Sequence, residues 1–187
     1  MELEISTEGA AKRLNRAVAM TVVMLSVFMA VAKIKDDNIV QAMQAAKTDM
    51  VDSWNEYQAA RLKLHMMEQT SEIIRITSGP NLSAEVVTKL AAIEAEKQRY
   101  QARSDALSTR AKGFEAVYDG LNIHDDQFDL ADAALAISLS LAAVAALTGM
   151  WILMFVSWGF GGFGLVMGLA GFAGWTLHPD WLVTLLT

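Results

Sequence analysis

Two stretches of this chain contain no charged residue, and they limit what the rest of the chain can form. They are residues 17–32, which is 16 positions, and residues 133–179, which is 47 positions. The other 124 of the 187 residues hold all 36 charged side chains. In a soluble domain about 25% of residues are charged, and stretches as long as these contain some of those charges. The separation therefore excludes an ordinary soluble enzyme and indicates apolar membrane helices joined to strongly solvated helix.

The first uncharged stretch is predicted to lie in a transmembrane helix over residues 17–34, after a juxtamembrane segment at 1–16. Sixteen helical residues span about 24 Å, slightly less than the hydrocarbon core of about 30 Å. Basic side chains at both ends can snorkel to the interfaces. The alternative is a cleaved signal peptide over residues 1–32, with a basic start and a small-x-small end. We favour the span, because the apolar stretch runs directly into a helical pattern.

The second uncharged stretch is long enough for two spans, since one span needs about 20 residues. We predict transmembrane helices at 129–148 and 151–175, separated at Gly149. A tryptophan at each end of the last helix is typical of an interfacial anchor. The tail at 176–187 is too short to cross a membrane and is expected to lie at the interface.

Small residues recur at four-residue spacing in the last predicted span, at Gly164, Gly168, Ala170 and Gly174. Such positions let helix backbones approach closely. Two interpretations stay open: packing against the preceding span of the same chain, or an interface between subunits.

The charged middle, residues 35–128, is predicted to form a long antiparallel helical hairpin. Its turn lies at 78–83, where a Gly-Pro pair stops one helix and Ser83 caps the next. The segments on either side, 35–77 and 83–125, have 43 residues each. Equal helices joined by a short turn form a hairpin.

Apolar residues at alternating steps of four and three indicate a coiled-coil seam in each of these helices. In the first helix the seam consists of Ile39, Met43, Ala46, Met50, Ser53, Tyr57, Ala60, Leu64, Met67, Ser71 and Ile74. In the second it consists of Val86, Leu90, Ile93, Lys97, Tyr100, Ser104, Leu107, Ala111, Phe114 and Tyr118. When the two helices are folded about the turn, small seam residues oppose large ones, as Ala60 opposes Tyr100. The exception is Lys97, which would face Leu64. Glu68 or Glu94 would neutralise the charge of Lys97. The alternative is that these helices pair with other subunits.

The strongest candidate for an interaction surface is the run Asp52-x-Trp54-x-x-Tyr57-Gln58. A tryptophan beside acids on a solvated helix is often an interface anchor, although Trp54 could equally widen the apolar seam. The acidic run at residues 124–132 could attract a hard cation, but its spacing matches no defined metal loop, so we favour stabilisation of a helix end.

This run, continued by Ala59, resembles a family of small bacterial membrane proteins catalogued only as a domain of unknown function. A second similar segment is Phe128-Asp129-Leu130-Ala131-Asp132-Ala133. The resemblance implies an N-terminal span, a long helical middle, two closing spans and a bacterial inner membrane. It implies no activity.

We therefore predict an all-α membrane protein that is not an enzyme and binds no cofactor or metal. The expected function is a scaffold that self-associates in membrane lipid as a homo-oligomer. The alternatives are an accessory subunit of a larger respiratory or transport complex, and a pore between subunits. The net charge of −6 argues against nucleic acid. Three basic residues before the first span and two after it favour a cytoplasmic N-terminus and a periplasmic hairpin.

Overall fold

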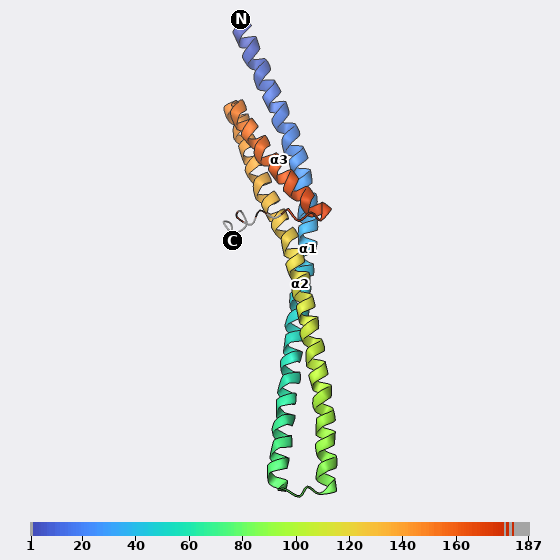
Figure 1. Cartoon of the computed structure of the whole chain (residues 1–187). Coiled ribbons are helices and arrows are strands. Elements are labelled where there is room, and N and C mark those ends of the chain that lie inside the picture. Colours follow the sequence, from blue (N-terminus) through green and yellow to red (C-terminus); the bar gives the residue numbers. More distant parts are fainter. Residues whose placement is uncertain (1, 178, 180, 182–187) are drawn as a thin grey trace. The chain divides into compact units, whose positions relative to one another are not determined.

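The chain is almost entirely helical. The computed structural model describes residues 2–177, 179 and 181, and in this part of the chain it has three helices and no strand. The helices are α1 (Glu2–Ser78), α2 (Ala84–Thr148) and α3 (Trp151–Ala173) (Figure 1). The predicted all-α class is confirmed.

Each helix contains a segment long and apolar enough to cross a membrane. This confirms the expectation of three such segments and fits a membrane protein. The helices are longer than the predicted spans, because α1 holds residues 2–16, the first apolar stretch and the following charged stretch without a break. Likewise α2 continues from charged into apolar sequence. Residues 2–16, the predicted juxtamembrane segment, are thus helical.

Glycines in the left-handed conformation stand at the helix ends. Gly79 follows α1 with φ +68°, and Gly149 follows α2 with φ +72°. Gly174 ends α3, and the Trp175 N–H donates a hydrogen bond to the Ala170 carbonyl at 3.0 Å. Because glycine adopts this conformation without a Cβ penalty, the three residues act as C-terminal helix stops. The last helix therefore ends at Ala173, two residues before the predicted Trp175.

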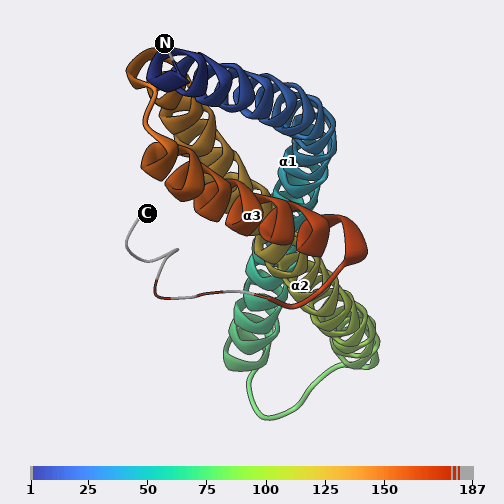
Figure 2. The same ribbon diagram turned by 90° about the horizontal axis from the view of Figure 1, so that it is seen from above.

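The chain divides into two compact units, which are described separately. The first consists of residues 1–42 and 120–187 and, within its described part, contains the beginning of α1, the end of α2 and all of α3. Viewed from above, α3 lies against the other two helical segments (Figure 2). Edge-to-face contacts join Phe172 of α3 to Phe28 and Phe128 at 6.2 and 5.2 Å between ring centroids.

Small polar side chains connect the helices of this first unit. Ser138 and Ser157 each donate to the other's backbone carbonyl, at 2.7 and 2.8 Å. The Trp158 indole N–H donates to the Thr21 hydroxyl at 2.9 Å. Both pairs satisfy polar groups in helical segments that are otherwise strongly apolar.

The second unit, Met43–Asp119, contains two helical arms. We call residues 43–78 the first arm and residues 84–119 the second arm; they lie side by side (Figure 1). Every seam residue in both arms is buried or partly buried. Glu56 and Arg103 form an ion pair at 3.2 Å, and the Lys63 ammonium lies 5.5 Å from the centre of the Tyr100 ring. These contacts join the arms near their middle.

Candidate functional site

The run from Asp52 to Gln58 lies on the first arm and spreads around the helix. Trp54 and Tyr57 are partly buried and pack edge to face, with ring centroids 5.3 Å apart. Asp52 and Gln58 are exposed. Tyr57 belongs to the seam and Trp54 lies beside it, whereas Asp52 and Gln58 face outward.

The face of the first arm directly opposite the seam carries solvent-exposed apolar residues. We call it the outer stripe, and it consists of Val51, Asn55, Gln58, Leu62, Met66, Gln69, Ile73 and Ile76. All eight residues are exposed, and Leu62, Ile73 and Ile76 keep 62%, 60% and 73% of their surface accessible. The sequence prediction missed this stripe except for Gln58. The signal was present, because these residues recur at steps of three and four just as the seam does.

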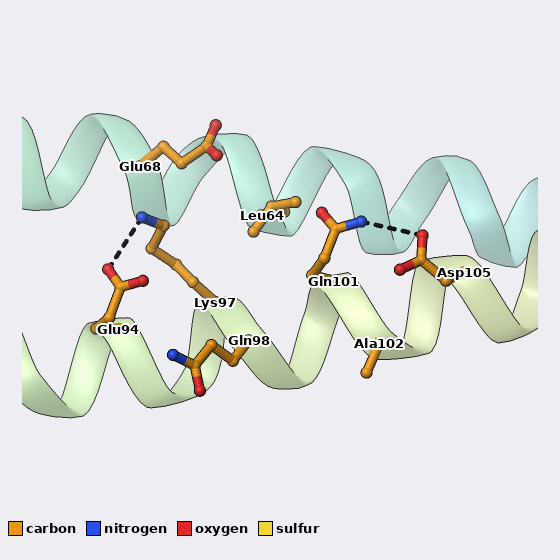
Figure 3. A pocket seen from close by; sticks show the side chains of 8 residues that line it. All are labelled: Leu64, Glu68, Glu94, Lys97, Gln98, Gln101, Ala102 and Asp105. Atoms are coloured by element: carbon orange, nitrogen blue, oxygen red, sulfur yellow. Dashed lines mark hydrogen bonds and ion pairs between the residues drawn. The ribbon is translucent and has the colours of Figure 1, made fainter.

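The Lys97 layer forms an open groove of about 380 Å³ between the arms (Figure 3). Leu64 and Glu68 line it from the first arm. The Lys97 ammonium bonds Glu94 at 3.1 Å, one of the two neutralising partners named from the sequence. Lys97 thus takes a place that an apolar residue would fill, and its charge is compensated along its own helix.

The small residues of α3 are used inside the chain. A Cβ on Gly164 would lie 2.8 Å from Leu135 Cγ, and one on Gly168 would lie 2.7 Å from the Phe28 ring. Ala170 is fully buried, and Gly174 ends the helix. Gly164 thus lies close to α2, the preceding span, and Gly168 lies close to α1.

Acidic side chains gather in the first unit where α1 and α2 leave their apolar segments. Asp36 is only 4% exposed, and its Oδ2 bonds the Lys33 ammonium at 2.8 Å. Partial burial, the Asp129 charge and the charge and hydrogen bonding of Asp36 raise the pKa of Asp125 to about 6. A hydrogen bond between these two carboxyls requires a proton on one of them, because two ionised carboxylates can only accept.

Among residues 2–177, 179 and 181, no group of three or more His, Cys, Asp or Glu side chains is arranged to hold a metal ion. Asp36 Oδ1 is buried and has no hydrogen-bond partner among these residues. Within the predicted tail at 176–187, His178, Asp180 and residues 182–187 lie outside the described residues. The polar groups at this end of the unit include Gln127, which is fully buried and donates to the carbonyls of Trp175 and Leu177 at 2.7 Å each.

Comparison with known proteins places the chain in one family. Residues 14–174 match the family described as Domain of unknown function (DUF4337), so the chain belongs to this family. No curated protein and no solved structure matches it.

Proposed function

We propose that this member of the DUF4337 family is a non-enzymatic membrane scaffold that self-associates and presents a helical hairpin outside the bilayer. The observation that carries the proposal is the exposure of Leu62, Ile73 and Ile76 on an arm that is otherwise rich in charge. Large apolar side chains gathered on one solvated face mark an interaction surface. A protein whose role is to hold a partner needs such a surface.

The hairpin is proposed to be an antiparallel coiled coil. The supporting observations are the burial of the seam residues and the pairing of Glu56 with Arg103. Antiparallel helices bring residues near equal distances from the turn together, as in this pair and in Lys63 with Tyr100. Such a hairpin is stiff, because each arm supports the other along its length.

We place the chain in a bacterial inner membrane with a cytoplasmic N-terminus and a periplasmic hairpin. The distribution of lysine and arginine around the first span supports this orientation. Single cysteines in this cysteine-free chain test it. Ala106→Cys on the second arm should react with a membrane-impermeant maleimide in intact cells, and Met150→Cys in the turn before α3 should react only after lysis. The reverse pattern would show the opposite orientation.

The test of the scaffold itself is the composition and mass of the native complex. The complex should be extracted at native abundance together with its surrounding lipid, so that the copies stay confined to one membrane patch, and weighed by native mass spectrometry. Several copies of one polypeptide are expected. Stoichiometric foreign subunits would instead indicate an accessory subunit, and a single copy would contradict self-association.

A further inference from the structure

The outer stripe has the geometry of a second helix-packing seam. Its residues follow one another at steps of four, three, four, four, three, four and three. Leu62 lies two residues from both Ala60 and Leu64 of the seam, which is about 160° around the helix in either direction. The first arm therefore has two opposite packing faces, and the second arm covers one of them.

The chemistry of the stripe restricts what can cover it. It contains five apolar residues and three amides but no charge, so an acidic or basic partner would leave a charge unpaired on burial. The outward face of the second arm is a poorer match, because its exposed residues, such as Ala91, Ala102 and Thr109, are small and would bury less apolar surface than a second copy of Leu62 or Ile73. An amide, in contrast, has both a donor and an acceptor and pairs with an identical amide.

From this self-complementary pattern we infer that the outer stripe binds the same stripe of a second copy of this chain, in parallel and in register. The inference rests on the proposed self-association and names its surface. Copies anchored in one membrane point the same way and lie at the same height, so a two-fold axis brings each residue against its counterpart. Gln58 and Gln69 then meet their own counterparts, as polar residues do in parallel two-stranded coiled coils.

The size of the contact determines where it forms. The stripe runs from Val51 to Ile76, about 38 Å, and a strip about 10 Å wide covers about 380 Å² on each copy. Stable soluble complexes bury about 800 Å² on each partner. Confinement to one membrane compensates for this smaller contact, because it raises the effective concentration of one copy around another. The pairing therefore has to be tested in membranes rather than in dilute detergent.

Disulfide crosslinking tests the register, because the chain has no cysteine of its own. Leu62→Cys and Gln69→Cys should each form a dimer on mild oxidation in native membranes. Thr70→Cys is the matched control, since it is exposed at the same height but turned about 100° away. Ala106→Cys is the control on the second arm. Neither control should crosslink.

A charge in the stripe gives an independent readout. Leu62→Glu in the Gln69→Cys background should lower crosslinking by about tenfold, because two like charges would face each other. Thr70→Glu, on the adjacent flank, should leave it unchanged, because the Thr70 hydroxyl bonds only the Met66 carbonyl of its own helix. Crosslinking at Ala106 or Thr70 equal to that at Gln69 would overturn the inference. Oligomeric mass without crosslinking at Leu62 or Gln69 would overturn it and leave self-association standing, whereas a single-copy mass would overturn both.

Discussion

Two glycines of α3, only two residues apart, should respond to the same substitution in opposite ways. In Gly164→Ala the new Cβ would lie 2.8 Å from Leu135 Cγ and 3.0 Å from the Ala131 carbonyl oxygen. The leucine can turn, but the carbonyl belongs to the backbone of α2. Such overpacking costs about 1–3 kcal/mol, and the better helix propensity of alanine returns about 0.5–1 kcal/mol. We therefore expect a net loss of about 1–2 kcal/mol.

Gly162→Ala is the matched control, because nothing lies within 4 Å of the position its Cβ would take. There only the helix propensity acts, which adds about 0.5–1 kcal/mol of stability. At about 2–4 °C for each kcal/mol, the melting temperatures of the two variants should differ by about 3–12 °C.

Thermal unfolding in detergent, followed by far-UV circular dichroism at equal protein concentration, measures this difference. A melting temperature of Gly164→Ala that equals or exceeds that of Gly162→Ala would show that Gly164 has room for a Cβ. A change in oligomeric mass with unchanged melting would instead place Gly164 at a subunit interface. The two interpretations of the small residues of α3 thus give different results in one pair of variants.

Three further substitutions probe other parts of the chain. The pKa of Asp125 is raised from 3.8 to about 6, so the folded chain binds this proton more tightly than the unfolded chain does. The stability of the folded chain therefore falls as pH rises from about 4 to about 6, and Asp125→Asn should remove this pH dependence. The full pKa shift would correspond to a change of about 3 kcal/mol in the free energy of unfolding. Solvent screening of this partly exposed group reduces that change to about 1 kcal/mol. The asparagine variant should therefore melt about 2–4 °C higher at pH 7.5 and equally at pH 4.5, and a larger gap at the lower pH would contradict the sign. Lys97→Leu should raise the melting temperature by about 2–4 °C, because an apolar side chain fills the layer beside Leu64; a drop would show that the layer needs its charge. Ser138→Ala should lower it by about 1–4 °C through loss of a buried interhelical bond, whereas Ser140→Ala, whose hydroxyl bonds only its own helix, should change it by less than about 1 °C.

The helical class and the three apolar segments were predictable because their signals are local. A stretch without charge indicates a membrane segment whatever surrounds it. Gly79 and Gly149 stand where the helices end, since the left-handed conformation favours glycine in any fold. The continuity of α1 was harder to predict, because a change from apolar to charged sequence alters the solvent around a helix without breaking its backbone.

The neighbours of each face were not predictable in the same way. Periodicity shows which residues share a side of a helix but not which element covers that side. The spacing of Gly164 and Gly168 fits a contact within the chain or between chains equally well, and it does not indicate the close approach of Leu135 and Phe28. Asp36 and Asp125 lie about equally far from the turn, as Ala60 and Tyr100 do, so periodicity alone does not indicate this pair but the hairpin register does.

The solvent around each unpaired face indicates where a self-associating chain would make its contact. In the first unit, exposed apolar residues of α3 such as Phe155 and Val166 would face lipid tails, which solvate them as well as another helix does. On the first arm, Leu62 and Ile73 would face water, and removing them from it stabilises a contact by about 25 cal/mol for each Å². The inner face of α3 is already occupied within the chain. For a self-associating chain, the main driving force would therefore lie in the outer stripe rather than in the membrane helices.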